Sequence, residues 1–375
     1  MTSSTVAAMR RANRMLRPAR LTKATRSVQK AMTGFMLDTS LIALKPKKAK
    51  PHKTAAPKAG RSLGAALIEL SAAQWGRDGG TAKPAVKPRV PAGAQYLTRT
   101  HRSASGSRGY KLYIPACHAR RPKGLILMLH GCNQSPDDFA TGTHMNALAE
   151  KHGLVVAYPA QTGGENSSHC WNWFKPGDQR RGRGEPALLA SLTRKLMREF
   201  GLGREGVFVA GLSAGGAMAS ILADVYPDVY SAAGVHSGLA RGAAHNVMSA
   251  MSAMRRGGVQ TDMAPVIATP SGPVRRIIFQ GEADNTVNPA NAASLVIAAL
   301  GGDTAPTKVG RRSVRGRAYD RSDFAGPDGA VLVELWMIEG AGHAWSGGSA
   351  RGSYTDSKGP DASAQMVRFF LTKPA

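Results

Sequence analysis

Acidic residues are scarce in this sequence: 24 Asp and Glu stand against 50 Lys and Arg, which gives a net charge of +26. The imbalance is concentrated near the start, since residues 1–100 hold 20 of the basic residues and 3 of the acidic ones. A strongly basic segment attracts polyanions, so it indicates contact with an anionic surface such as a granule, a membrane or nucleic acid. A solvated tail without a dedicated partner is the alternative.

Cysteine and long apolar runs are also rare. Three cysteines exclude a disulfide-rich scaffold and leave at least one thiol unpaired within the chain. No stretch approaches the ~20 apolar residues of a membrane-spanning helix, so we expect no transmembrane segment. The first residues carry several arginines with no apolar stretch between them, unlike a secretory signal. This pattern predicts a cytoplasmic location, with an extracellular one as the alternative.

What the sequence does contain divides into three zones. Residues 1–44 are basic, with apolar residues at helical spacing, which predicts short amphipathic helices. Residues 45–95 are rich in Lys, Pro, Ala and Gly and predict a linker, because that composition buries too little apolar surface to fold. In residues 96–375, apolar β-prone runs alternate with helical stretches. The alternation predicts an α/β domain with a mostly parallel, doubly wound sheet, preceded by a partly helical or disordered N-terminal region.

The sharpest local pattern is Gly211-Leu212-Ser213-Ala214-Gly215, between an apolar strand at 207–210 and a helix of small residues at 217–225. A G-x-S-x-G sequence in this context is typical of a nucleophile elbow. There the serine occupies a strained strand-to-helix turn that tolerates only small neighbours. The N-terminus of the following helix stabilises negative charge beside the serine. Ser213 is therefore the predicted nucleophile.

The base must come from a histidine after Ser213, because hydrolases of this type run in the order Ser, acid, His. His343 follows a predicted strand at 332–338 and is the predicted base. His236 ends the strand after the elbow, and we expect it to shape the floor of the pocket. His245 lies in a helix-like stretch and is expected on the surface.

The acid is expected in the loop after the predicted strand 277–279. Asp284 occupies the position from which a carboxylate orients the histidine. Glu282, two residues earlier, is its rival within the same loop. Asp284 is the predicted acid.

The loop after the predicted strand 125–129 contains His130-Gly131-Cys132-Asn133. One oxyanion N–H of such enzymes belongs to the residue after the nucleophile, here Ala214, and the second to a loop like this one. We expect the main-chain N–H of Cys132 to be that second donor. Cys170 either pairs with Cys132 in a disulfide, or both stay reduced thiols in a reducing compartment. A zinc site is a third alternative, with ligands from His130, Cys132, His169 and Cys170. It is disfavoured because a serine triad needs no metal.

Three tryptophans, Trp171, Trp173 and Trp345, flank the predicted pocket residues in the sequence. Apolar aromatic walls suit an ester with an apolar acyl part, so these side chains are the predicted substrate contacts. Three core tryptophans are the alternative.

Together these motifs resemble the poly(3-hydroxybutyrate) depolymerase family of esterases, which is similar to feruloyl and acetylxylan esterases of the same fold. The resemblance covers the chain from about Tyr96 to its end. The segments that carry it are Leu129-His130-Gly131-Cys132, Cys170-Trp171-Asn172-Trp173, Gly211-Leu212-Ser213-Ala214-Gly215-Gly216, Gly281-Glu282-Ala283-Asp284 and Gly342-His343-Ala344-Trp345. One departure is Gln280-Gly281, where family members often show His-Gly.

The resemblance implies an α/β-hydrolase that cleaves carboxylic esters through an acyl-enzyme, without a metal or an organic cofactor. It implies a triad of Ser213, Asp284 and His343, oxyanion donors at Cys132 and Ala214, and Cys132 close in space to Cys170. The expected substrate is poly- or oligo-3-hydroxyalkanoate, with a feruloyl or acetylxylan-type esterase as the alternative. A polyanion- or granule-surface-binding protein that uses its basic tail is the alternative of another class.

Overall fold

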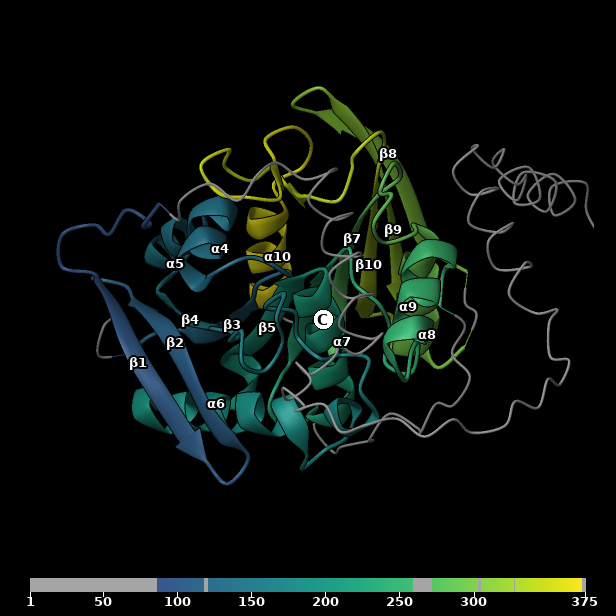
Figure 1. Ribbon diagram of the computed structural model, residues 1–375. Helices are drawn as coiled ribbons and strands as arrows, with labels where there is room; N and C mark the ends of the chain where they lie inside the picture. The colour runs from purple at the N-terminus through teal and green to yellow at the C-terminus, as the bar shows by residue number, and fades with distance from the viewer. Residues whose placement is uncertain (1–85, 118–120, 259–271, 303–304, 327, 373–375) are drawn as a thin grey trace, which may run out of the picture. The chain divides into compact units, whose positions relative to one another are not determined.

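A computed structural model describes residues 86–117, 121–258, 272–302, 305–326 and 328–372 (Figure 1). The predicted amphipathic segment 1–44 and the linker as far as residue 85 lie outside these residues. Among the helices that are described, none has the length and apolar character needed to cross a bilayer.

One large sheet organises the described chain. Its strands are β1 (Gln95–Ser103), β2 (Gly106–Ile114), β3 (Gly124–Leu129), β4 (Leu154–Pro159), β5 (Val207–Leu212), β6 (Ala232–His236), β7 (Arg275–Gly281), β8 (Lys308–Val314), β9 (Arg317–Ala325) and β10 (Val331–Ile338). The strand order is β1-β2-β4-β3-β5-β6-β7-β10-β9-β8. The six strands from β4 to β10 in this order are parallel, and antiparallel strands complete both edges.

Helices cover both faces of this sheet (Figure 1). One face carries α6 (Gly184–Phe200), α7 (Ala214–Val225), α8 (Val247–Arg256) and α9 (Ala290–Leu300). The other carries α4 (Pro136–Thr143), α5 (Met145–His152) and α10 (Ala362–Leu371). Short elements are the 3₁₀ turns Pro176–Gln179 and Arg204–Gly206 and the parallel pair β11 (Trp345–Ser346) and β12 (Thr355–Asp356).

The central strands are apolar along their whole length because both of their faces are buried. In β5, Val207 and Val209 pack under α6 and α7, while Phe208, Ala210 and Leu212 point into the opposite core. Each large apolar side chain buried in this way stabilises the fold by about 1.5–3 kcal/mol. A strand buried on both sides is typical of a parallel sheet between two helical layers.

The parallel strands place the candidate site residues at the carboxyl ends of the strands, on one side of the sheet. Loops that leave the carboxyl ends of parallel strands meet at the same edge, where ligands bind in open α/β sheets. Ser213 follows β5, His236 ends β6, Asp284 follows β7 and His343 follows β10. The strands β5, β6, β7 and β10 are consecutive neighbours in the sheet.

The structure extends several predicted elements and adds some that the sequence does not predict. The helix predicted at 217–225 begins at Ala214, directly after the elbow serine. The hairpin β8–β9 is new: its outer strand is rich in arginine and almost entirely exposed, so it lacks the apolar alternation that marks a strand. His245 is exposed, as expected, but it precedes α8 and is not part of a helix.

Residues 86–94, assigned to the linker on composition, contact the domain at the two ends of the stretch. The hydroxyl of Thr141 in α4 donates a 2.5 Å hydrogen bond to the main-chain carbonyl of Val86. Ala94 packs against the core beneath α4 and α5. The described part of the linker therefore belongs to the folded body.

Candidate active site

Ser213 stands in the strained turn between β5 and α7. Its backbone has φ 57° and ψ −120°, a conformation that L-residues rarely adopt. Gly211 and Gly215 make the turn possible, since a Cβ at Gly211 would collide with the main chain of Gly215. A Cβ at Gly215 would in turn collide with the carbonyl of Leu129 at the end of β3. This geometry is that of a nucleophile elbow.

The surroundings of Ser213 hold its backbone from two sides. Its N–H donates to the carbonyl of His236 at 2.9 Å, and its carbonyl accepts from Ala217 N at 2.9 Å in the first turn of α7. Its side chain lies at the N-terminus of α7, where the helix dipole favours negative charge.

Asp284 and His343 are hydrogen-bonded to each other. Nδ1 of His343 donates to Oδ2 of Asp284 at 2.8 Å. With Nδ1 occupied, Nε2 is the nitrogen left to exchange a proton, and it makes no hydrogen bond to any residue that the structure describes. The rival carboxylate Glu282 is exposed. The structure therefore pairs Asp284 with His343 and leaves Glu282 out of the pair.

The carboxylate of Asp284 is held in its ionised form. Its Oδ1 accepts main-chain N–H groups from Thr286 at 2.9 Å and Val287 at 2.8 Å. Burial acts to raise the pKa of Asp284, but the neighbouring His343 and these N–H donors outweigh it, and the pKa lies below its usual value. A carboxylate fixed in this way can orient the imidazole and stabilise its protonated form.

Gln280, which the sequence marked only as a departure from the family pattern, contacts the acid directly. Its side-chain amide donates to Oδ2 of Asp284 at 3.2 Å and to the carbonyl of Val287 at 3.1 Å. The side chain is buried at the end of β7. Sequence reasoning missed this contact, and its only signal was a polar residue at the end of an apolar strand.

His236 lies under the site and is not a second base. Its ring is stacked between Phe279 and Trp345, with centroids 5.7 and 5.3 Å away. Nε2 accepts the main-chain N–H of Ser346 at 3.1 Å, which places the ring proton on Nδ1. Burial lowers the pKa of His236 to about 3, so the ring is neutral at ordinary pH. It connects the backbone of Ser213 to the loop that follows His343.

The two predicted oxyanion donors, Cys132 and Ala214, have main-chain N–H groups without an acceptor in the described chain. The start of α7 packs directly against the end of β3, as the close approach of Gly215 to Leu129 shows. The neighbouring N–H, that of Gly131, is already bonded to the side chain of Gln134 at 2.9 Å. The N–H groups of Cys132 and Ala214 therefore stay available for a substrate oxygen.

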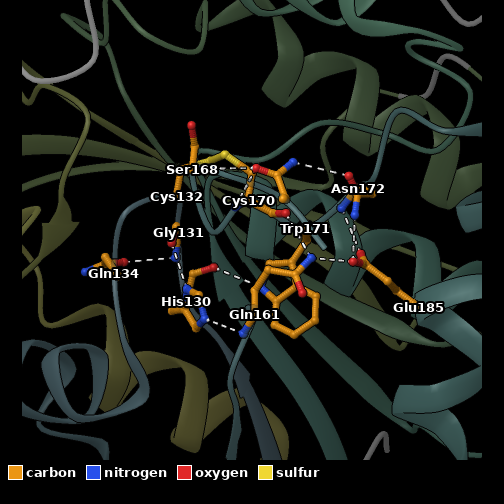
Figure 2. Close-up of a disulfide and its surroundings, with 11 residues drawn as sticks. His130, Gly131, Cys132, Gln134, Gln161, Ser168, Cys170, Trp171, Asn172 and Glu185 are labelled. Atoms are coloured by element: carbon orange, nitrogen blue, oxygen red, sulfur yellow. Dashed lines mark hydrogen bonds between the residues drawn. A yellow bond between two sulfur atoms is a disulfide. The ribbon is translucent and has the colours of Figure 1, made fainter. Parts of the chain in front are cut away.

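Cys132 and Cys170 form a disulfide with a Cα–Cα distance of 4.3 Å (Figure 2). Both sulfurs are bonded to each other, so they are not the thiolates that a zinc site needs. Both ring nitrogens of His130 are also engaged, Nδ1 with Gly131 O at 2.8 Å and Nε2 with Gln161 N at 3.1 Å. The zinc alternative of the sequence analysis is therefore inconsistent with these contacts.

Comparison with known proteins identifies the family. Residues 108–315 match the family described as esterase PHB depolymerase. The chain belongs to this family. The match contains Ser213, Asp284 and both cysteines of the disulfide, and ends before His343.

Members and neighbours of the family are similar over part of their length. Poly(3-hydroxyalkanoate) depolymerase C of Paucimonas lemoignei is 33% identical over 230 residues, which cover 58% of this chain and 54% of that protein. Probable acetylxylan esterase A of Neosartorya fischeri is 28% identical over 242 residues, which cover 60% of this chain and 62% of that protein. The chain thus spans less than two thirds of either relative.

A solved structure, acetyl xylan esterase from Aspergillus awamori, matches with a TM-score of 0.53 and 23% identity. The match covers 67% of this chain and 93% of that chain. Together with the mostly parallel sheet and its helices on both faces, this likeness confirms the predicted α/β-hydrolase fold.

The predicted substrate contacts of this family member need correction. Trp171 and Trp345 are 0% and 1% exposed, so neither offers a surface to a substrate. Trp171 donates through Nε1 to the carbonyl of His130, and Trp345 donates to the hydroxyl of Ser363. Both are core side chains. Trp173 is 5% exposed, and its role in substrate binding stays a prediction.

Proposed function

We propose that the protein is a serine carboxylic-ester hydrolase, with Ser213 as nucleophile, His343 as base and Asp284 as the acid that orients it. One observation carries the proposal: the 2.8 Å hydrogen bond between Asp284 and His343, whose loops follow the neighbouring strands β7 and β10. These loops leave the sheet at the edge where the Ser213 elbow stands. Membership of an esterase family supports the reaction class.

In the first half of the proposed reaction, Nε2 of His343 takes the proton of the Ser213 hydroxyl as its oxygen attacks the ester carbonyl. Asp284 stabilises the imidazolium that forms. The tetrahedral oxyanion accepts hydrogen bonds from the N–H groups of Cys132 and Ala214. His343 then donates its proton to the departing alcohol, and Ser213 is left as an acyl ester.

In the second half, water attacks the acyl ester. His343 takes a proton from the water, and the same two N–H groups bind the second oxyanion. The C–O bond to Ser213 breaks, the serine oxygen regains its proton from His343, and the carboxylic acid leaves. His343 accepts and donates the proton in each transfer of both half-reactions.

The proposed substrate is a poly- or oligo-3-hydroxyalkanoate. The family description and the name of the Paucimonas lemoignei relative support this choice. An acetylxylan or feruloyl ester is the second candidate, because relatives of both names also match, over 242 and 150 residues respectively. Both classes are carboxylic esters, so the same triad serves either one.

A panel of substrates tests the proposal. Hydrolysis rates would be measured on p-nitrophenyl esters of increasing acyl length, on 3-hydroxybutyrate oligomers, and on acetylated and feruloylated sugars. We expect the highest kcat/KM among the natural esters on the hydroxybutyrate oligomers. A higher kcat/KM on the sugar esters would identify an acetylxylan or feruloyl ester as the substrate. No activity on any ester would refute the proposal.

The basic segment 1–85 supports a separate proposal, that the protein binds an anionic surface while it acts. The support is the charge of the sequence, since these residues lie outside the described part. Titration of salt against binding to DNA and to anionic vesicles tests it, because phosphate contacts weaken steeply with salt. Binding that is equal with and without this segment would contradict it.

A cytoplasmic location also stays a proposal. The disulfide is an argument for the extracellular alternative, because disulfides persist in oxidising compartments.

A further inference from the structure

The buried carboxyl group of Glu185 lies beside Asn172, next to the loops that the disulfide joins (Figure 2). It belongs to the first turn of α6 and is 6% exposed. Its Oε2 accepts the main-chain N–H of Asn172 at 2.8 Å, and its Oε1 accepts the side-chain Nδ2 of the same residue at 2.9 Å. Glu185 therefore fixes both the backbone and the side chain of Asn172, two residues after Cys170.

Gln161 extends this attachment to the disulfide itself. Its Nε2 donates both to Glu185 Oε1 and to the carbonyl of Cys170, the latter at 3.0 Å. Its main-chain N–H donates to Nε2 of His130 at 3.1 Å. Gln161 thus bonds at once to the carboxylate, to one cysteine of the disulfide, and to the start of the loop that carries the other.

The loop of Cys132 has further bonds to the same segment. Asn133 N donates to Ser168 O at 2.8 Å, and Nε1 of Trp171 donates to His130 O at 3.0 Å. With the disulfide, these bonds join residues 130–133 to residues 168–172 along their length (Figure 2). A shift of the second segment would therefore move the first.

Burial raises the pKa of Glu185, and the neighbouring carboxylate of Asp178, which accepts the main-chain N–H of Glu185 at 2.7 Å, adds to the rise, while the N–H groups of Asn172 and Gln161 lower it. The three hydrogen bonds to the side chain of Glu185 all come from N–H donors, for which it has acceptor lone pairs in either protonation state. A positive charge lies nearby, because the buried guanidinium of Arg108 donates to Gln161 Oε1. Loss of one partner from a buried hydrogen-bond network leaves the other polar groups unsatisfied. The side chain of Glu185 thus joins Asn172 and Gln161 in one hydrogen-bond network.

We propose that Glu185 is a positioning residue for the oxyanion hole: it holds the segment 170–172 and, through Gln161 and the disulfide, the main-chain N–H of Cys132. The inference rests on the proposed function, because it assumes that this N–H binds the substrate oxyanion. Glu185 touches no reacting atom. We therefore expect replacement of Glu185 to destabilise the transition state and to leave substrate binding in the ground state unchanged.

The experiment compares Glu185→Gln with a control on the same helix, Glu199→Gln. Glu199 is at the far end of α6, where it pairs with Arg99 at 2.6 Å and takes no part in the network. For each variant, kcat and KM on p-nitrophenyl butyrate would be measured, together with the rate constant for labelling of Ser213 by a fluorophosphonate. The phosphoryl oxygen of this probe occupies the oxyanion hole during attack.

We expect Glu185→Gln to lower kcat and the labelling rate by about 10–100-fold with KM within about twofold, somewhat less than the loss of a whole oxyanion donor. Glu199→Gln should stay within about twofold in all three constants. Rates are expressed per site that can be labelled, so that a lower folded fraction is not counted as slower chemistry. A folded Glu185→Gln protein labelled at the parent rate, or one in which only KM changes, would overturn the inference.

A second variant covers the case in which Glu185→Gln does not fold. Asn172→Ala removes the side-chain bond to Glu185, together with the bond that Asn166 donates to Asn172 Oδ1, and keeps the main-chain bond to Glu185. We expect the same pattern with a smaller fall, about 3–10-fold in kcat and labelling rate; parent-like rates would overturn the inference. Failure of the proposed function has a different signature, since the parent protein itself would then carry no adduct on Ser213.

Discussion

Gln280 and Asp284 are joined by a hydrogen bond of 3.2 Å from the side-chain amide to the carboxylate oxygen Oδ2. The same oxygen accepts the Nδ1–H of His343. The amide therefore fixes the one carboxylate oxygen that orients the imidazole, and it does so from inside the sheet, where Gln280 is buried.

The variant Gln280→Leu tests the importance of this bond. Leucine keeps most of the volume but donates no hydrogen bond, so we expect kcat to fall by about tenfold with KM little changed. Gln280→His, which restores an N–H donor, should recover a large part of kcat. Steady-state kinetics on a soluble ester check both variants. A kcat for Gln280→Leu within twofold of the parent would show that the other hydrogen bonds of Asp284 are sufficient.

Two buried neutral histidines should make the domain less stable in acid. Burial lowers the pKa of His130 to about 4 and that of His236 to about 3, from an ordinary value of 6.5. The unfolded chain therefore binds more protons below pH 6.5, and stability falls as the pH drops from there toward the two folded values. By pH 4.5 each histidine should cost roughly 2–3 kcal/mol of unfolding free energy.

Urea unfolding at pH 7 and pH 4.5 measures this effect. The variant His236→Gln keeps an acceptor for the N–H of Ser346 but does not titrate in this range. Its loss of stability between the two pH values should be smaller than that of the parent by roughly 2–3 kcal/mol. Equal losses of unfolding free energy in the two proteins would show that His236 does not contribute to the instability in acid.

Removal of the disulfide should weaken the fold and slow the chemistry. The bond closes a loop between positions 38 apart, for which the chain-entropy estimate is roughly 3–4 kcal/mol. We expect the double variant Cys132→Ser/Cys170→Ser to lose about 2–4 kcal/mol in urea unfolding, with a lower kcat on a soluble ester. Cys117→Ser is the control, since that thiol is free and exposed. A double variant as stable and active as the control would contradict the prediction.

Deletion of residues 1–85 should leave hydrolysis of a small soluble ester within a few-fold of the parent rate. The proposed triad and oxyanion donors all lie between Cys132 and His343, far along the chain. The deletion stops at residue 85 because Val86 already accepts a hydrogen bond from Thr141. Specific activity per labelled site on p-nitrophenyl butyrate is the measurement, and a loss of more than about tenfold would assign the deleted segment a part in the active site.

Local patterns in the sequence were sufficient for the elbow, the fold class and the order of the site residues. The turn at Ser213 needs small residues two positions to either side, so its motif is visible in the sequence. Asp284 and His343 follow strands with a continuous apolar character, and the chain order of such enzymes points to them. The outer strand of the hairpin, β8, is almost entirely exposed and lacks apolar alternation, which is why the sequence does not predict it.

The sequence did not predict the direction in which individual side chains point. Trp171 and Trp345 are adjacent to site motifs in the sequence, but their indoles turn into the core. Gln280 and Glu185 look like an unremarkable polar strand residue and an ordinary acidic residue in the first turn of a helix. Their roles depend on contacts with Asp284 and Asn172, which are fixed only when the strands and helices pack.

The most direct test of the account is the rate of Ser213→Ala. Alanine fits the elbow without strain beyond that of serine, so the variant should fold as the parent does, which circular dichroism and urea unfolding can establish. We predict that the variant hydrolyses p-nitrophenyl butyrate about 10⁴–10⁶-fold more slowly than the parent and forms no fluorophosphonate adduct. A folded Ser213→Ala protein that keeps about a tenth of the parent rate would contradict the assignment of Ser213 as the nucleophile.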